Sequence, residues 1–487
     1  MGGMAAAVNK RGENSVPSVV AMLRQLAHRG SDVYGVATPV SGTVAHSIDE
    51  LQVESMSSSF GVGQNLLRAD WRDRPQPVLG EGYAFVFEGR LFPSPTKCDV
   101  EEAMGKFKSN LWKDSAKIIE ELNGSYAFAV ASPDRLIVGR DTVGTNPLYY
   151  GENVRLFAVA SERKALWNLG VEEAKSFPPG NLASINKQDI TFQPVKTIIQ
   201  PPQESISMEE AAERLQTLVL ESTKQRVADI ERIAVAFSGG LDSTLIAMLA
   251  KMCDANVHLI SVGLENQLER EHAKNTAAAL ELPLSVQTCT LNDVEKALPK
   301  VLWLVEEPNP LKASIAIPFF WTAETASKLG CRILLAGQGA DELFGGYRRY
   351  LSKYAHLNAE ALEKEMYSDV ALSYKTNFQR DNPVCAFHGV ELRLPFADYK
   401  VVRFALSLPT ELKIESADDN LRKRVLRLVA QNLGLPSFIV NRKKKAIQYT
   451  TGVDRALRQL ARREGLTLNE YIRQVFRKVY PNVRAKQ

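Results

Sequence analysis

The sequence has no apolar run of the roughly 20 residues that a membrane-spanning helix needs, because charged residues or glycines interrupt every candidate. It also lacks, near its first residue, the basic segment and apolar stretch of a secretory signal peptide. Cysteine is scarce: the five cysteines are scattered and show no CxxC spacing. These absences argue against a membrane protein, a disulfide framework or a zinc site, and they predict a reducing, cytoplasmic setting.

Nothing in the sequence resembles an RNA-binding motif, although the end of the chain is basic. From residue 401 onward there are 19 Lys and Arg and 7 Asp and Glu, a net charge of +12. Because the whole chain has a net charge of +4, the first 400 residues have a net charge of −8. Such a basic end is typical either of nucleic-acid binding or of cations that face a polyphosphate ligand beside a solvated helical surface. Without interleaved aromatic residues we favour the second interpretation and expect no nucleic-acid partner.

A chain of 487 residues is too long for one ordinary core and predicts two or three domains. Alternating apolar and polar residues, together with β-branched and aromatic residues, predict that the first 165 residues form mostly strands, with one helix-like segment at 16–30. The predicted strands are 4–8, 83–89, 125–132, 135–141 and 146–150. The Pro-rich segment 168–207 predicts a final hairpin followed by a linker.

The pattern of apolar residues changes at about residue 208. Residues 207–230 have apolar positions at helical spacing, with Ser207 as the predicted N-cap and Glu210 three residues on. Strands then alternate with helices: strands at 233–237, 257–264 and 332–336, helices at 244–252 and 268–280. This alternation predicts a parallel, doubly wound sheet, and after about residue 350 the chain reads as mainly helical.

The segment SGGLDS (238–243) lies between a predicted strand and a predicted helix. Its two glycines allow the backbone to approach an anion, and Ser238, Ser243 and the helix N-terminus supply donors and positive potential. No Walker lysine follows, so this is not the GxxxxGK[ST] phosphate loop. Asp242 would repel a bare phosphate but suits Mg²⁺ that bridges phosphate oxygens. The alternative is a Gly-rich turn without a ligand.

A second loop, GQGADELFGGY (337–347), follows the strand at 332–336. The carboxyl ends of parallel strands converge on one crevice, so this loop is expected to face SGGLDS. Asp242 and Asp341 together would then hold a Mg²⁺-pyrophosphate group.

Six segments occur in the order found in glutamine-dependent asparagine synthetases, and the chain resembles that family over almost its whole length. They are SGGLDS, SVGL (261–264), EEPNP (306–310), GQGADELFGGYRRY (337–350), ELRLPFAD (391–398) and RKKKAIQYTTGV (442–453). The resemblance implies an N-terminal-nucleophile glutaminase-like αββα sandwich at 1–200 and an α/β ATP-pyrophosphatase domain with a helical end at 208–487. Gln338 departs from the family, where many members have Glu, and is more similar to an archaeal-type branch.

The resemblance also implies roles for individual residues. Ser238, Gly239, Gly240, Asp242 and Ser243 would wrap the phosphates of ATP, with Val262 and Gly337 along the adenosine and Asp242 and Asp341 on Mg²⁺. Lys444 would neutralise charge on the α-phosphate and the leaving pyrophosphate.

Two of these assignments have a structural alternative. The basic run 442–445 could be a solvated loop, since charge runs usually are. Glu391 is a candidate catalytic residue, and equally a candidate for a buried ion pair with Arg393.

The first half resembles the family's glutaminase domain through HRGSD (28–32), RDTVGTNPLYY (140–150) and SERKALW (161–167). Family members begin Met-Cys-Gly, and the Cys is the nucleophile that its own α-amine activates. This chain has Gly2 at that position, and glycine has no thiol. Glutamine hydrolysis by the usual route is therefore not expected.

Other positions of the glutamine pocket also depart from the family. The Asn-Gly of the oxyanion hole is Glu88-Gly89 here, and the Asp-Gly that holds the glutamine amine is Asn123-Gly124. The Arg that pairs with the glutamine carboxylate has no clear equivalent, with Arg68 as a candidate. Several departures together suggest a natural pseudo-glutaminase, while an introduced Gly2 in a divergent branch stays open.

The sequence thus predicts an ATP- and Mg²⁺-dependent ligase that converts aspartate and ammonia to asparagine, AMP and diphosphate through an acyl-adenylate. A β-lactam-synthetase-like ligase, which closes an intramolecular amide, is the main alternative. A catalytically silent nucleotide-binding partner is an alternative of another class, and nucleobase adenylation such as tRNA thiolation is a fourth. The carboxylate substrate, the source of ammonia and the oligomeric state, including a homodimer, stay open.

Overall fold

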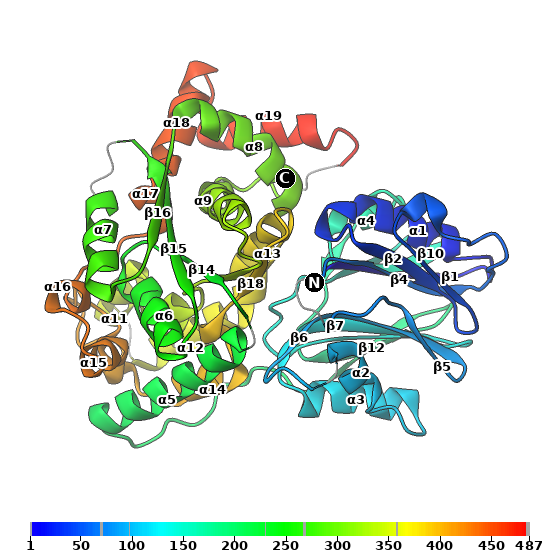
Figure 1. Cartoon of the computed structure of the whole chain (residues 1–487), viewed down its shortest axis with the longest axis horizontal. Coiled ribbons are helices and arrows are strands. Elements are labelled where there is room, and N and C mark those ends of the chain that lie inside the picture. The colour runs from blue at the N-terminus through cyan, green and yellow to red at the C-terminus, as the bar shows by residue number, and fades with distance from the viewer. Residues whose placement is uncertain are drawn as a thin grey trace. The chain divides into compact units, whose positions relative to one another are not determined.

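The computed structural model describes residues 2–68, 72–96, 98–228, 230–265, 269–356 and 359–483. The chain divides into two compact units, Met1–Ile198 with Pro481–Gln487, and Ile199–Tyr480 (Figure 1). We call them unit 1 and unit 2 and describe each by itself.

Unit 1 contains two antiparallel sheets. The first has the order β11-β9-β10-β1-β4-β2-β3 and the second the order β13-β12-β8-β7-β6-β5. The strands of the first sheet are β1 (Gly2–Asn9), β2 (Val33–Ala37), β3 (Gly42–Ala45), β4 (Phe60–Leu66), β9 (Tyr149–Glu152), β10 (Leu156–Ala160) and β11 (Lys175–Ser176). Those of the second are β5 (Val78–Gly80), β6 (Tyr83–Leu91), β7 (Gly124–Ala131), β8 (Leu136–Arg140), β12 (Asn181–Ile185) and β13 (Ile190–Pro194).

The two sheets of unit 1 lie face to face, and helices cover their outer faces (Figure 1). Helices α1 (Val16–Gln25) and α4 (Arg163–Trp167) pack on the first sheet, and α2 (Asp99–Met104) and α3 (Leu111–Glu121) on the second. All eight residues of β1 are buried, since Met4, Ala6 and Val8 face the second sheet while Ala5 and Ala7 face α1. Burial on both faces explains why β1 reads as a continuous apolar run. This αββα sandwich confirms the predicted fold of the first half.

The structure corrects several details of the first half. The helix predicted at 16–30 ends at Gln25, and a short 3₁₀ turn (Ala27–Arg29) follows it. The strand predicted at 146–150 begins only at Tyr149. Helices α2 and α4 were missed because they are too short to show a 3.6-residue period. Helix α3 was also missed, although it has 11 residues and an Asn110 cap. The predicted final hairpin is confirmed as β12 and β13.

Unit 2 is built on a parallel five-stranded sheet of order β16-β15-β14-β17-β18. Its strands are β14 (Ile233–Ala236), β15 (Val257–Leu264), β16 (Leu284–Cys289), β17 (Ile333–Leu335) and β18 (Glu391–Arg393). Helices α6 (Leu241–Met252) and α7 (Glu269–Leu280) pack on one face, with α9 (Pro310–Lys328) and α13 (Gln379–Ala386) on the other (Figure 1). The predicted doubly wound sheet is confirmed, although β16 and β18 were not foreseen.

Helix α5 (Met208–Val227) begins where the sequence indicated, because the Ser207 side chain accepts a hydrogen bond from the Glu210 amide. Helix α7 is described from Glu269, and residue 268, where this helix was predicted to begin, lies outside the described residues. The Ser207 cap shows that local sequence sets the start of α5.

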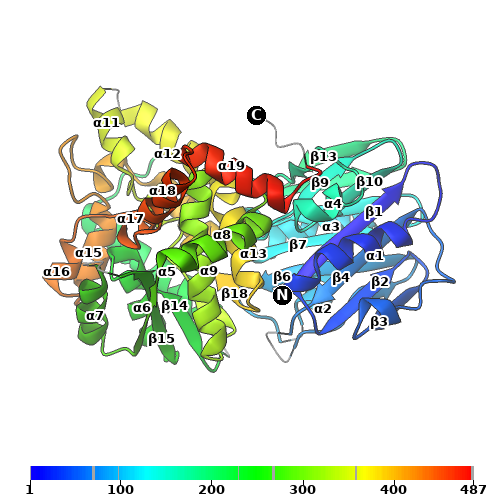
Figure 2. The same cartoon turned by 90° about the horizontal axis from the view of Figure 1, so that it is seen from above.

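The predicted helical character after residue 350 is confirmed. Besides α13, the helices from residue 340 onward are α10 (Ala340–Leu343), α11 (Arg348–His356), α12 (Ala359–Ser373), α14 (Tyr399–Ser407), α15 (Arg424–Asn432), α16 (Ser437–Val440), α17 (Ile447–Thr450), α18 (Val453–Arg463) and α19 (Leu468–Val479). Helices α18 and α19 pack against α8 (Leu291–Val305), and α18 also packs against α9 (Figure 2). The last two helices of unit 2 thereby lie on the face of the sheet that α9 covers.

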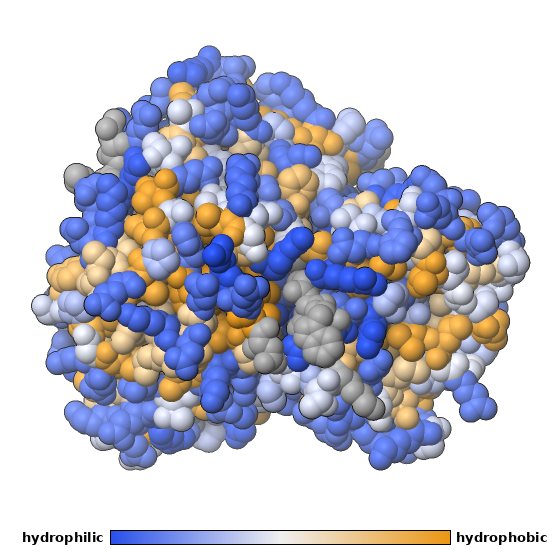
Figure 3. Space-filling model, viewed as in Figure 1, coloured by the Kyte–Doolittle hydropathy of each residue, from blue (hydrophilic) through white to orange (hydrophobic). Residues whose placement is uncertain are grey.

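Within the described residues, no helix combines the length and the hydropathy that a membrane span requires. Hydrophilic side chains cover much of the face shown in Figure 3, with apolar side chains between them.

Candidate functional site

The loop between β14 and α6 carries SGGLDS. Gly239 has φ +66°, and a Cβ there would lie 3.0 Å from the Ala273 Cα, so the turn requires glycine. The Ser238 amide donates to the Ser243 hydroxyl over 3.3 Å, and the Gly240 amide donates to the Ser238 hydroxyl over 3.2 Å. The donors expected to hold phosphates are thus gathered at the N-terminus of α6.

The loop between β17 and α10 lies against the first loop. Strands β14 and β17 pair in parallel, so their carboxyl ends are adjacent. A Cβ at Gly337 would lie 2.9 Å from the Asp242 Cβ. The predicted convergence of the two motifs is therefore real, and Asp242 and Asp341 face each other across it.

Two lysines hold the pair of aspartates together. The Lys423 ammonium lies 2.7 Å from the Asp242 carboxylate and 2.5 Å from that of Asp341. The Lys444 ammonium lies 2.7 Å from Asp341 and 3.6 Å from Asp242. Lys444 had been expected at this site, whereas Lys423 had not. No signal distinguishes Lys423 in LRKRVLR from a solvated lysine at a helix start, although its φ of 56° marks an unusual backbone.

The electrostatics of the site follow from these contacts. Burial alone would raise the pKa of Asp341, but Lys423 and Lys444 outweigh it and lower that pKa. Burial opposes the charge of Lys444, yet Asp341 and Asp242 raise its pKa. Asp341 and Lys444 are therefore both charged at neutral pH, and each stabilises the charge of the other.

Gly346 allows this close approach. A Cβ at that position would lie 2.0 Å from the Asp341 carboxylate oxygen and 2.4 Å from the Lys423 Cε. The second glycine of the ELFGGY segment is thus needed for the contact between Asp341 and Lys423.

A cavity of about 510 Å³ opens beside the two loops. Its lining includes seven residues that the sequence had assigned to the site: Ser238, Asp242, Ser243, Val262, Gly337, Asp341 and Lys444. The size is in the usual range for a small-molecule site. The Leu264 amide donates to the Thr451 carbonyl over 2.9 Å, which brings the segment 447–451 beside β15 and Val262.

Glu391 lies elsewhere. It is buried in β18, and the Arg393 guanidinium lies 2.7 Å from its carboxylate and donates to the Arg226 carbonyl as well. These are the contacts of a structural ion pair, and Glu391 is not among the residues that line the cavity. Its catalytic role remains a prediction.

Further charged and amide side chains lie in and around the lining of the cavity. The Gln338 amide donates to the Asp381 carboxylate over 2.5 Å, and Asp381 is fully buried and paired with Arg380 over 2.6 Å. The buried Glu342 accepts from Tyr347 and Asn377, and burial followed by the nearby Asp341 raises its pKa. Gln338 thus supports a buried carboxylate where many family members place one on the loop itself.

The donor set fits Mg²⁺. Both aspartates reach one ammonium, Lys423, so one cation can contact them both. The described residues include no group of three or more His, Cys, Asp or Glu side chains that could hold a metal ion. Two carboxylates that leave positions for phosphate oxygens and water are what Mg²⁺ prefers.

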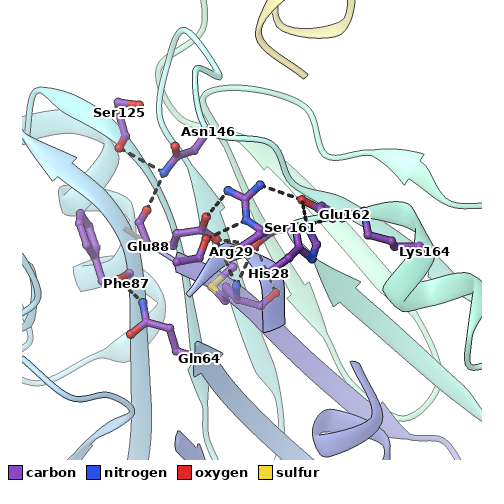
Figure 4. A network of polar contacts seen from close by, with 12 residues as sticks. His28, Arg29, Gln64, Phe87, Glu88, Ser125, Asn146, Ser161, Glu162 and Lys164 are labelled. Atoms are coloured by element: carbon purple, nitrogen blue, oxygen red, sulfur yellow. Dashed lines mark hydrogen bonds and ion pairs between the residues drawn. The ribbon is translucent and has the colours of Figure 1, made fainter. Parts of the chain in front are cut away.

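In unit 1 residues around the start of β1 form a polar network (Figure 4). Gly2 is the first residue of β1 and pairs with Leu66 of β4. Glu88 projects into the network from β6, and Gly89 follows it with φ +132°. Arg68 is exposed outside the network, and Asn123 lies just after α3, where its carbonyl accepts from the Phe92 amide.

Comparison with known proteins agrees with this geometry. The family model for asparagine synthase matches residues 214–358 and 352–480, and that for a glutamine amidotransferase domain matches residues 73–168. A protein of Methanocaldococcus jannaschii, provisionally named glutamine-hydrolyzing asparagine synthetase 1, is 31% identical, and the match covers 94% of this chain and 95% of that one. The chain belongs to the asparagine synthase family. The predicted family and fold class are thereby confirmed.

More distant members of the family agree. The glutamine-hydrolyzing asparagine synthetase 2 of Lotus japonicus is 26% identical, with 89% of this chain and 75% of that one covered. Among solved structures, the glutamine phosphoribosylpyrophosphate amidotransferase of B. subtilis matches with a TM-score of 0.36 and 17% identity, over 58% of this chain and 65% of that one. That score is too low to support an argument.

Proposed function

We propose that this chain is an ATP-dependent asparagine synthetase, in which residues 208–487 activate aspartate and residues 1–200 form a glutamine-amidotransferase-like domain. The observation that carries the proposal is the joint contact of Asp242 and Asp341 with Lys423 and Lys444 beside the SGGLDS loop. Such a cluster suits the triphosphate of ATP, whose negative charge needs cations and amide donors.

The proposed reaction has two steps. The β-carboxylate of aspartate attacks the α-phosphorus of ATP, which forms β-aspartyl-AMP and releases pyrophosphate. Ammonia then attacks the acyl carbon, the C–N bond forms, the C–O bond to AMP breaks, and the nitrogen loses a proton. Lys444 would balance the charge that develops on the phosphates during the first step.

The loop residues position the nucleotide. Ser238, Gly240 and Ser243 offer hydroxyl and amide donors at the N-terminus of α6, and Val262 lies on the adjacent strand. When bound, Mg²⁺ would neutralise charge on the departing pyrophosphate, with Asp242 and Asp341 as its protein ligands. These residue roles are part of the proposal.

The alternatives are less well supported. The relatives are named asparagine synthetases, and none of those quoted above is named a β-lactam synthetase. A silent nucleotide-binding partner has no need for two lysines on an aspartate pair beside a cavity of about 510 Å³. The five free cysteines suit the expected cytoplasmic setting. A homodimer stays an open part of the proposal.

The decisive experiment measures pyrophosphate release from ATP and Mg²⁺ with ammonium chloride and aspartate, together with asparagine formation. We expect one asparagine for each pyrophosphate. Glutamate and β-alanine serve as control carboxylates and are expected to give at least about tenfold less turnover, since a misplaced carboxylate loses its alignment with the α-phosphorus. No turnover with aspartate would contradict the assignment.

A further inference from the structure

The start of β1 has no room for a side chain at the nucleophile position. Gly2 pairs with Leu66 and Gly3 with Asn65, so strand pairing continues to the second residue. A Cβ on Gly2 would lie 1.8 Å from the Asn65 carbonyl oxygen and 2.9 Å from its carbonyl carbon. Both are backbone atoms, which do not move aside as the end of a flexible side chain does. Position 2 therefore requires glycine in this fold.

The Glu88 carboxylate occupies the space beside this strand end. One oxygen accepts from the Met4 amide over 3.1 Å and from the Ser161 hydroxyl, and the other lies 2.9 Å from the Arg29 guanidinium (Figure 4). The side chain of Glu88 is only 2% exposed. Every contact holds the carboxylate in place, and the Asn146 amide in addition fixes the Glu88 carbonyl over 2.9 Å.

Further charges complete the network. Arg29 donates to the Gly2 carbonyl over 2.8 Å and lies 3.0 Å from Glu162. Glu162 also contacts the Lys164 ammonium, and His28 at 3.0 Å. Burial lowers the pKa of His28 despite Glu162, so His28 is neutral at pH 7. Two cations then balance two carboxylates, as a buried ion network requires.

The side chains of Arg29, Glu88, Glu162 and Lys164 are each at most 2% exposed. A cavity of about 20 Å³ is lined by Gln64, Phe87 and Gly89 among others, and none of the charged residues of the network lines it. Such a volume holds about one water molecule. A ligand could take the place of the Glu88 carboxylate only if its contacts with Met4, Ser161 and Arg29 were broken.

We propose that this network keeps the nucleophile pocket of unit 1 closed, with Glu88 as the residue that excludes glutamine, and that the nitrogen for ligation enters as free ammonia. The statement on ammonia rests on the proposed synthetase function, whereas the exclusion of glutamine does not.

The chemistry of Glu88 agrees with exclusion. An ionised carboxylate only accepts hydrogen bonds, so it cannot donate to the oxyanion of an amide-hydrolysis intermediate and would repel its charge. The amide of the family's Asn can donate. A pocket that had lost only its thiol would have kept that donor, whereas the Glu88 carboxylate stands at this position here.

The first test uses the unaltered chain. Equilibrium dialysis with radiolabelled glutamine at up to 10 mM is expected to show no binding, and glutamate release is expected to stay at the level of the buffer blank. Pyrophosphate release with aspartate is measured beside it with ammonium or with ammonia-free glutamine as nitrogen source. We expect at least a hundredfold preference for ammonium. Bound or hydrolysed glutamine would overturn the inference, whereas failure with ammonium but no glutamine binding would overturn only the synthetase proposal.

The second test uses Gly2→Cys, which restores the nucleophile of the family. We expect no glutamate release, because a side chain at position 2 would meet the backbone of Asn65 and Leu66. Recovery of glutamine hydrolysis by this one change would show an open pocket and overturn the inference. Because Gly2→Cys could fail by misfolding, the stability test below provides an independent criterion.

The third test asks whether Glu88 serves structure or substrate binding. Glu88→Gln keeps the shape of the side chain but removes its charge. Of the two carboxylates that Arg29 contacts, only Glu162 then remains. We expect the thermal midpoint to fall by roughly 6–12 °C, because breaking a buried ion pair is costly. The control Glu121→Gln alters an exposed partner of Lys106 and is expected to shift the midpoint by less than about 1 °C. An unchanged or raised midpoint for Glu88→Gln would overturn the inference, since residues kept for ligand binding often limit stability.

Discussion

Lys423 and Lys444 contact the same two aspartates, but their exposure separates their tasks. The side chain of Lys423 is 2% exposed and that of Lys444 is 27% exposed. Lys444 also lines the cavity, whereas Lys423 is not among the lining residues. Lys423 is therefore suited to fixing the positions of the two aspartates, and Lys444 is suited to contacting the substrate.

Lys444→Met tests the second task against a neighbour of the same type. Lys443 is exposed and does not line the cavity, so Lys443→Met is the matched control. We expect kcat for pyrophosphate release to fall about 10²–10³-fold in Lys444→Met, since a fixed charge at a developing anion is a large catalytic contribution. The control should stay within about twofold of the unaltered chain. Equal losses in both variants would support a solvated basic loop that attracts ATP only through its net charge.

The sequence predicted the phosphate loops more completely than the network in unit 1, for a physical reason. SGGLDS and GADELFGGY are each continuous segments that follow a strand, so one short stretch contains both the turn and the ligand groups. The network draws Gly2, Arg29, Glu88 and Glu162 from separate elements up to 160 positions apart. The substitutions at positions 2 and 88 were visible in the sequence, but their contact with Arg29 was not. Lys423 was missed because its partners lie 82 and 181 positions away.

At the scale of elements, the sequence predicted helices α5, α6 and α7 but not α8 or α9, although α8 has a capping box and α9 is 19 residues long. Helix α5 has both a Ser207 cap and a periodic apolar face. Strand β18 has three residues and was not foreseen, since three positions cannot define an alternation. Whether such a short segment forms a strand depends on its burial within the folded unit.

The junction between the 3₁₀ turn Thr410–Leu412 and α15 contains a buried lysine. Lys413 is 3% exposed and lies beside Ile414, which belongs to an apolar cluster with Tyr350, Leu362 and Met366. Burial lowers the pKa of Lys413 from its usual value near 10.5 to about 8, although Glu363 opposes the shift. The unfolded chain therefore binds a proton between pH 8 and 10.5 that the folded chain does not.

This shift predicts how stability depends on pH. Above pH 10.5 Lys413 is neutral in both states and its burial costs no stability. As the pH falls from 10.5 through about 8, the free energy of unfolding decreases, because only the unfolded chain readily takes up the proton. Lys413→Met should remove this dependence and raise the free energy of unfolding at pH 7 by up to about 3 kcal/mol. Urea unfolding of unit 2, followed by circular dichroism at pH 7, 8, 9 and 10, measures it. Lys400→Met, at an exposed position of α14, is the control and should leave the pH profile unchanged. A destabilised Lys413→Met protein would indicate that the ammonium is better compensated than its burial suggests.

At the scale of the whole molecule, each unit has a hydrophobic core of its own. In unit 1 the residues between the two sheets include Val86, Ala129 and Val138, and a second cluster lies under α2 and α3. In unit 2 the buried residues of β14, β17 and α8 include Val235, Leu335 and Leu298. A core within each unit is what separately cooperative domains require.

Calorimetry of the full chain can test this separation. Phe128→Ala removes a fully buried ring from β7 of unit 1, and Leu298→Ala removes a fully buried side chain from α8 of unit 2. Each costs about 2–5 kcal/mol, so each should lower one thermal transition by several degrees and leave the other in place. ATP with Mg²⁺ should raise only the transition that Leu298→Ala lowers, because the proposed nucleotide site is built from unit 2 alone. If both substitutions moved a single transition, unit 1 would be a cooperative part of the synthetase and could not be regarded as a separately folded domain with a closed pocket.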